Sequence, residues 1–141
     1  MTDYGIIIGK FSPVHYGHVK LVEEAFKECN KLIIFIGSSD SATNIENPFT
    51  YQQREDMLKG VFSSYLNTIQ ILPLPDFLYN NNAWVKYIQK NVSAIAGEGT
   101  KKIVGCFDGS EAGYLKWFNW PVYSVPKFQK ISSSEIRERI L

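Results

Sequence analysis

Short apolar runs alternate along this chain with stretches whose apolar residues recur at the spacing of a helix. The runs predict five β-strands, over residues 4–8, 32–36, 68–72, 102–107 and 122–125. Helices are predicted over residues 19–29, 50–62, 82–94 and 110–118, with a last helix opening at Ser132. Strands that alternate with helices are typical of βαβ units. We therefore expect an α/β fold, a Rossmann-like parallel five-stranded sheet with helices on both faces.

The size and composition of the chain indicate one globular domain. Its 141 residues suit a single domain over residues 1–141, because domains commonly run to about 100–150 residues. The net charge of +1 gives no indication of nucleic-acid or membrane binding. No apolar stretch approaches the roughly 20 residues that span a bilayer, and the N-terminus lacks the features of a signal peptide. Cys29 and Cys106 lie in apolar runs, as free thiols do in a reducing compartment, so we expect a cytoplasmic protein.

The segment 9–18, Gly-Lys-Phe-Ser-Pro-Val-His-Tyr-Gly-His, joins the first strand to the first helix and holds both histidines of the chain. Gly17 lets the backbone approach a ligand, and the helix start offers free N–H groups and the positive end of the helix dipole. His15 and His18 are therefore predicted to contact phosphate oxygens, with Lys10 adding positive charge. His18, in the first turn, can donate to charge that develops on a transferring phosphoryl group. A metal pair or two ordinary histidines is less favoured, because helical metal pairs are four residues apart and no third ligand is evident.

A second candidate anion site lies near the other end of the chain. Ser132-x-x-Glu135 has the pattern of a capping box, with Arg137 following in the same helix. The simplest interpretation is a helix cap with an exposed arginine. The hydroxyls of Ser132, Ser133 and Ser134, free N–H groups and the Arg137 guanidinium would also bind phosphate. We favour that interpretation, in which a triphosphate is held between two helix starts.

Two further segments follow predicted strands. Residues 47–54 predict a turn, an N-cap at Thr50 and a helix, without any indication of function. Residues 76–84 predict a loop that ends at Trp84. Two interpretations of this loop stay open: Trp84 is a core residue, or it stacks on a flat ring while the loop hydrogen-bonds a carboxamide.

Two of these segments carry a resemblance to a known family. Residues 9–18 resemble the signature G-x-F-x-P-x-H-x-G-H of the nucleotidyltransferase superfamily, and residues 131–137 resemble its second signature, I-S-S-T-x-I-R. Asn-Pro-Phe-Thr with a following arginine, Pro-Asp with a following asparagine and tryptophan, and the terminal Ser-x-x-Glu-Ile-Arg are similar to the archaeal-type nicotinamide-mononucleotide (NMN) adenylyltransferases. That group includes bacterial relatives fused to a Nudix hydrolase domain, so two alternatives stay open: a stand-alone enzyme and one domain of a longer chain.

The resemblance implies an activity, a cofactor and a set of site residues. The implied reaction joins NMN to the AMP of ATP, giving NAD and pyrophosphate, with Mg²⁺ accompanying ATP and a homo-oligomer as the expected assembly. The catalytic residues it implies are His15, His18, Lys10 and Arg137. The residues it implies for ATP binding are Gly9, Lys10, Phe11, His15, His18, Ser132, Ser133, Ser134 and Arg137. Those it implies for NMN binding are Ser38, Asn47, Asp76, Asn81 and Trp84, with Asn81 chosen among three asparagines by its spacing from Trp84.

The chain departs from the family pattern at several positions. Lys10 replaces the usual arginine and keeps the charge without its bidentate geometry. Glu46 stands where a basic residue is common, and Ser134 replaces a threonine. Transfer to another phosphate substrate, such as phosphopantetheine or a polyol phosphate, stays open, as does a module that senses ATP or NAD without turnover. The sequence leaves the choice between NMN and nicotinic acid mononucleotide open as well.

Overall fold

The computed structural model describes residues 1–45, 47–106 and 110–126 of the chain. Within these ranges, five strands form one sheet in the order β3-β2-β1-β4-β5, and every neighbouring pair is parallel. The strands are Thr2–Gly9 (β1), Cys29–Gly37 (β2), Ile69–Leu74 (β3), Lys101–Gly105 (β4) and Val122–Ser124 (β5). The predicted five-stranded parallel sheet is confirmed.

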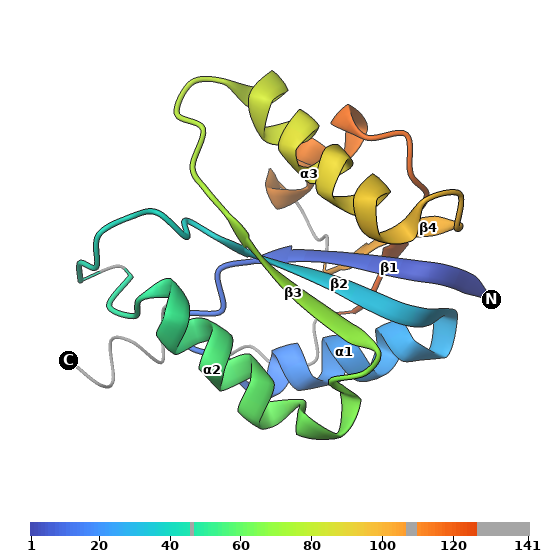
Figure 1. Cartoon of the computed structure of the whole chain (residues 1–141), viewed down its shortest axis with the longest axis horizontal. Helices are drawn as coiled ribbons and strands as arrows, with labels where there is room; N and C mark the ends of the chain where they lie inside the picture. The colour runs from blue at the N-terminus through green and yellow to red at the C-terminus, as the bar shows by residue number, and fades with distance from the viewer. Residues whose placement is uncertain (46, 107–109, 127–141) are drawn as a thin grey trace.

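Helices cover both faces of this sheet (Figure 1). The elements are α1 (Tyr16–Glu28), α2 (Tyr51–Val61), α3 (Asn81–Ala96) and two 3₁₀ helices, η1 (Ser63–Tyr65) and η2 (Ser110–Trp117). The helices α1 and α2 lie on one face, and α3 lies on the other (Figure 1). Each face of the sheet carries a hydrophobic core, and alternate residues of β2 point into one or the other. Ile34 packs in the cluster on the α1 and α2 side, and Ile33 packs in the cluster on the α3 side. This two-sided burial explains the nearly continuous apolar run of the strand.

Side-chain caps set where the helices begin. The predicted capping box at Thr50 is present: Thr50 Oγ1 accepts from the Gln53 N–H (3.1 Å), and the Gln53 side chain accepts from the Thr50 N–H (2.8 Å). His15 caps α1, and the side chain of Asn80 caps α3 by accepting from the Ala83 N–H (3.0 Å). The caps therefore tie the helix starts directly to the loops that carry the candidate site.

Several element boundaries differ from the sequence-based expectation, those at Pro73 and Cys29 among them. Pro73 was expected to stop the third strand, but β3 runs through it to Leu74, with Pro73 paired to Ile36. Because β3 is an edge strand, the missing N–H of a proline is tolerated there. Cys29, expected on the first helix, is the first residue of β2. The predicted helix at Ser132 lies outside the described residues.

The topology places the carboxyl end of β1 at the centre of the molecule. β1 lies between β2 and β4, so the strand order reverses direction there. In open parallel sheets, ligands bind beyond the carboxyl ends of the strands at such a switch point. Among the described residues, none of the helices combines the length and the apolar character that crossing a bilayer requires.

Candidate active site

Two imidazoles are fixed in the turn that follows β1. His15 Nδ1 accepts a hydrogen bond from the Gly17 N–H (3.0 Å), and His18 Nδ1 accepts one from the His15 N–H (3.0 Å). An accepting Nδ1 carries no proton, so the ring proton of each histidine lies on Nε2. The capping hydrogen bonds thus select the tautomer in which His18 donates from Nε2.

The environment of His18 keeps its ring neutral. Burial and, to a smaller extent, the neighbouring His15 lower the pKa of His18 to about 3. The His15 and His18 rings are stacked with centroids 3.8 Å apart, and Phe11 packs against His18 at 4.6 Å. At neutral pH the ring is therefore uncharged and can donate a hydrogen bond from Nε2.

Close packing requires glycine at position 17. A Cβ added there would lie 2.8 Å from His15 Cε1. Phe11 has φ 52° and is 2% exposed, so its ring belongs to the core beneath His18. Any contact between Phe11 and ATP must therefore come from its backbone. Gly9 ends β1, with the exposed Lys10 following directly.

Asn47 joins a second loop to this turn. Its Oδ1 accepts from the Ser12 hydroxyl (2.7 Å), and its N–H donates to Asn44 Oδ1 (2.8 Å). Both Ser12 and Asn47 are buried. Asn47 therefore shapes the turn that carries the histidines, a role that its sequence position did not indicate.

Polar side chains connect the ends of β2 and β3. Asp76 accepts from the hydroxyls of Ser38 (3.0 Å) and Ser41 (2.5 Å), and its N–H donates to Asp40 Oδ1 (2.9 Å). Ser38 has φ 52°, a left-handed conformation rare for residues with side chains. The two predicted residues Ser38 and Asp76 are thus brought together at one edge of the sheet.

Asp76 also belongs to a pocket that contains the predicted aromatic residue. The pocket has a volume of about 640 Å³, and Asp76, Asn81 and Trp84 line it together with Tyr114, Lys116 and Trp117. Trp84 makes edge contacts with Tyr114 (5.6 Å between centroids) and Trp117 (6.1 Å). Sequence reasoning missed these two aromatic partners, because nothing in the pattern of η2 places them opposite α3.

Asparagine positions differ in what they do at this pocket. The Asn80 side chain is occupied as the N-cap of α3, whereas Asn81 lines the pocket with Trp84. Trp84 is half-buried and packs against the cluster on the α3 side. Its ring therefore combines core contacts with a face of the pocket, and the two interpretations of the sequence are compatible.

A smaller pocket of about 270 Å³ lies beside the start of α1. Gly17 and Leu21 line it from α1, and Cys106 and Val125 line it from the ends of β4 and β5. The side chain of Cys106 is thus a neighbour of the histidine turn. Ser132, Ser133, Ser134 and Arg137 lie outside the described residues, as does Glu46.

Arg54 is a residue of this region that sequence reasoning missed. Its side chain is fully buried and donates to backbone carbonyls at the ends of β1 and β2. A signal was present in the helical phase, since Arg54 precedes the buried Leu58 and Phe62 by four and eight residues. A charged residue on the apolar face of a helix indicates a specific partner.

Comparison with known proteins shows the family of this chain. The model of the family described as cytidylyltransferase-like matches residues 6–139. A nicotinamide-nucleotide adenylyltransferase of Pyrococcus horikoshii is 32% identical over 143 aligned residues, which cover 97% of this chain and 72% of that protein.

Solved structures give the same result. A bifunctional NMN adenylyltransferase/ADP ribose pyrophosphatase from Francisella tularensis superposes with a TM-score of 0.92 at 32% identity. The match covers 99% of this chain and 42% of that one, so this chain spans less than half of the bifunctional protein. A second structure of the Francisella protein, complexed with AMP and a Mn ion, has a TM-score of 0.89, with 32% identity over 99% of this chain and 41% of that one.

Proposed function

This chain belongs to the cytidylyltransferase-like family, and from that premise we propose that it is a nicotinamide-nucleotide adenylyltransferase, which transfers AMP from ATP to NMN and releases pyrophosphate. The observation that carries the proposal is the pairing of two features at one edge of the sheet. The Nε2–H donor of His18 lies at the end of β1, and a pocket lined by Trp84 lies beyond β3. One suits phosphate oxygens and the other suits a flat aromatic ring.

The proposed chemistry is direct in-line attack. The 5′-phosphate of NMN attacks the α-phosphorus of ATP, the new P–O bond forms, and the bond to pyrophosphate breaks. The nucleophile is already an ionised phosphate oxygen, so no covalent enzyme intermediate is needed. Catalysis then consists of positioning and charge stabilisation. His18 donates to the phosphate oxygens, while His15, Lys10 and the start of α1 bind the triphosphate from the same side.

The remaining ATP contacts are assigned to segments at both ends of the chain. Ser132, Ser133, Ser134 and Arg137 are proposed to hold the triphosphate opposite the histidines, by their match to the family's second signature. Gly9 and Phe11 are proposed to contribute through the backbone.

The nicotinamide end is assigned to the pocket beyond β3. Trp84 stacks on the pyridine ring, and Asn81 and Asp76 recognise the carboxamide. Ser38 forms the wall between the two subsites through its hydrogen bond to Asp76. Asn47 acts by shaping the turn through Ser12.

A divalent cation, Mg²⁺ by expectation, accompanies ATP in this proposal. The described part of the chain holds no group of three or more His, Cys, Asp or Glu side chains suited to a metal ion. We propose that the phosphate oxygens of ATP would hold the ion, since Mg²⁺ is usually bound through substrate phosphates and waters. When bound, the ion neutralises phosphate charge.

The location, assembly and domain organisation of the protein are proposed from the same family resemblance. We expect a cytoplasmic homo-oligomer without nucleic-acid or membrane partners, and one adenylyltransferase domain over residues 1–141. A Nudix domain in the native protein is compatible with the match to the Francisella bifunctional protein.

The test is pyrophosphate release from ATP with a panel of acceptors. NMN, nicotinic acid mononucleotide, phosphopantetheine and glycerol phosphate are supplied in turn, and we expect release with a pyridine mononucleotide. The His18→Ala variant should lose about 10²–10³-fold in kcat, the scale of one lost transition-state donor. If pyrophosphate is released only with phosphopantetheine or glycerol phosphate, that compound is the acceptor and NMN is not. Binding of ATP without release for any acceptor would favour a nucleotide sensor.

A further inference from the structure

A single buried guanidinium donates hydrogen bonds to backbone oxygens at the ends of two neighbouring strands. Arg54, on α2, is 0% exposed. Its Nη1 donates to the carbonyl oxygens of Lys10 (3.1 Å) and Gly37 (2.6 Å), and its Nη2 donates to that of Ser38 (3.1 Å). Its Nε donates to the carbonyl of Thr50, the N-cap of its own helix (3.2 Å). Four of the five guanidinium N–H directions are thereby used.

These acceptors belong to the two halves of the candidate site. Lys10 is at the start of the turn that holds His15 and His18. Ser38 is at the start of the loop after β2, and its hydroxyl donates to Asp76. In a trans peptide the N–H lies opposite the carbonyl. Holding the carbonyls of Lys10 and Gly37 therefore points the N–H groups of the next residues away from the guanidinium. One planar group thus sets the orientation of both loops.

The charge of Arg54 is retained despite its burial. Burial lowers its pKa, whereas the neighbouring Tyr51 and Asp76 raise it. An arginine in a protein stays protonated, so all of its donors persist. A lysine at this position would bring a compact ammonium with no planar fork and could not reach acceptors on both sides in the same geometry.

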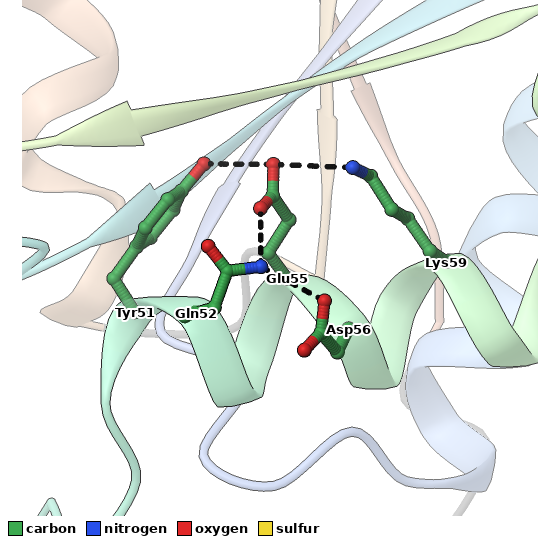
Figure 2. Close-up of polar contacts among 5 residues, drawn as sticks. All are labelled: Tyr51, Gln52, Glu55, Asp56 and Lys59. Atoms are coloured by element: carbon green, nitrogen blue, oxygen red, sulfur yellow. Dashed lines mark hydrogen bonds and ion pairs between the residues drawn. The ribbon is translucent and has the colours of Figure 1, made fainter.

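Side chains along the helix that carries Arg54 are linked by hydrogen bonds and an ion pair. Figure 2 shows Glu55 at the centre of this network: it accepts from the Tyr51 hydroxyl (3.3 Å) and from Gln52 (3.1 Å), and it pairs with Lys59 (3.6 Å). Gln52 also donates to Asp56 (2.9 Å). Burial, and then Glu55, raise the pKa of Tyr51 to about 12, so its hydroxyl remains a donor. The first turns of α2 therefore form a fixed base for the guanidinium.

We propose that Arg54 is a positioning residue that sets the separation between the triphosphate turn and the Ser38–Asp76 wall, and hence the alignment of the two bound nucleotides. The proposal rests on the proposed adenylyl transfer. In-line attack depends on the mutual placement of the two substrates, and a misplacement of about 1 Å costs on the order of 100-fold in rate. Each nucleotide still meets its own loop, so the affinity for either one alone depends less on Arg54.

The test compares Arg54→Lys with Leu58→Ala in the whole chain. Leu58 lies one turn further along α2, is 0% exposed and packs in the core without a place in the site. For both variants and wild type we would measure kcat with ATP and NMN, the separate Kd for each nucleotide, and Tm. Backbone ¹⁵N–¹H spectra would report the amides of Phe11 and Ser38 without any substrate.

Arg54→Lys should lose about 100-fold in kcat, while either Kd changes by less than about fivefold. Its Phe11 and Ser38 amide signals should shift. Leu58→Ala should lose Tm but keep kcat and those signals. Should Arg54→Lys fail to fold, Arg54→Gln in sucrose, which stabilises folded states, takes its place.

Three results would overturn the proposal: a kcat of the arginine variant within twofold of wild type, an equal loss in Leu58→Ala, or amide signals that do not move. Failure of the proposed function is a separate result, namely wild type without turnover on NMN. The acceptor with which wild type does react then replaces NMN in the same comparison. Without any acceptor, the amide shifts decide whether Arg54 holds both loops.

Discussion

The neutral, buried state of His18 predicts a pH dependence of stability that can be worked out from the structure. Its pKa falls from 6.5 in the unfolded chain to about 3 in the folded one. Between these values the unfolded chain binds a proton that the folded chain does not. Stability is therefore lost as pH falls below 6.5, by about 1.4 kcal/mol per pH unit. From pH 7 to pH 5, His18 should cost the fold about 2 kcal/mol.

The perturbation that isolates this contribution is His18→Asn. The asparagine Oδ1 can replace the ring Nδ1 as the acceptor of the His15 N–H, but it does not titrate. Urea unfolding at pH 5, 6, 7 and 8 would give the free energy of unfolding of both proteins. We expect the difference between them to change by about 2 kcal/mol across pH 7 to 5, with wild type losing more. Titrating groups that do not interact with His18 cancel in this difference.

An NMR titration supplies an independent check of the same reasoning. The His18 Hε1 signal should stay at its neutral position down to pH 5, and the pH profile of kcat should show no limb near 6.5 from this residue. Unfolding free energies of wild type and His18→Asn that fall in parallel below pH 7 would refute the burial argument, as would a His18 signal that titrates near 6.5.

Three further substitutions test the packing of the site. Gly17→Ala adds a Cβ 2.8 Å from His15 Cε1, so we expect kcat/KM for ATP to fall by about tenfold or more. Its control, Gly5→Ala, adds a Cβ 2.8 Å from Leu32 Cδ2 and should lower the free energy of unfolding by about 1–3 kcal/mol while leaving KM for ATP unchanged. Equal changes in kcat/KM for ATP in Gly17→Ala and Gly5→Ala would contradict the argument that the added Cβ acts on His15. Trp84→Ala should raise KM for NMN more than KM for ATP; equal increases in steady-state assays would make Trp84 only a core residue.

Regular elements were predictable because their burial leaves a regular pattern of apolar residues in the sequence. The run before Ser38 is apolar at every position from Leu32 to Ile36, since β2 is covered on both faces. The capping box at Thr50 was equally clear, because its two partners are three residues apart. The end of β3 was predicted wrongly at Pro73, because the sequence does not tell which strand lies at the edge of the sheet.

The candidate site was predictable only where local chemistry marks it. His15 and His18 stand out because a strand, a glycine and a helix start surround them in one short segment. The aromatic wall of the second pocket did not stand out, since Trp84 meets Tyr114 and Trp117 from an element about 30 residues away. Sequence periodicity carries no information on such a pairing between separate elements.

The contacts that join the two halves of the site are the least visible in the sequence, and a physical reason accounts for this. Parallel strands that end at one edge leave carbonyl groups there that no neighbouring strand satisfies, and burial makes each of them costly. A donor for these carbonyls can come from any element that covers the edge; here Arg54 donates to the carbonyl of Lys10 across 44 residues. An arginine at such a position looks like a surface charge until the strand order is known. What does mark it is its place on the buried face of α2 with Leu58, where an unpaired charge would be untenable. A charged residue in phase with a helix core is therefore the signal to follow when the loops of a parallel sheet have to be placed from sequence.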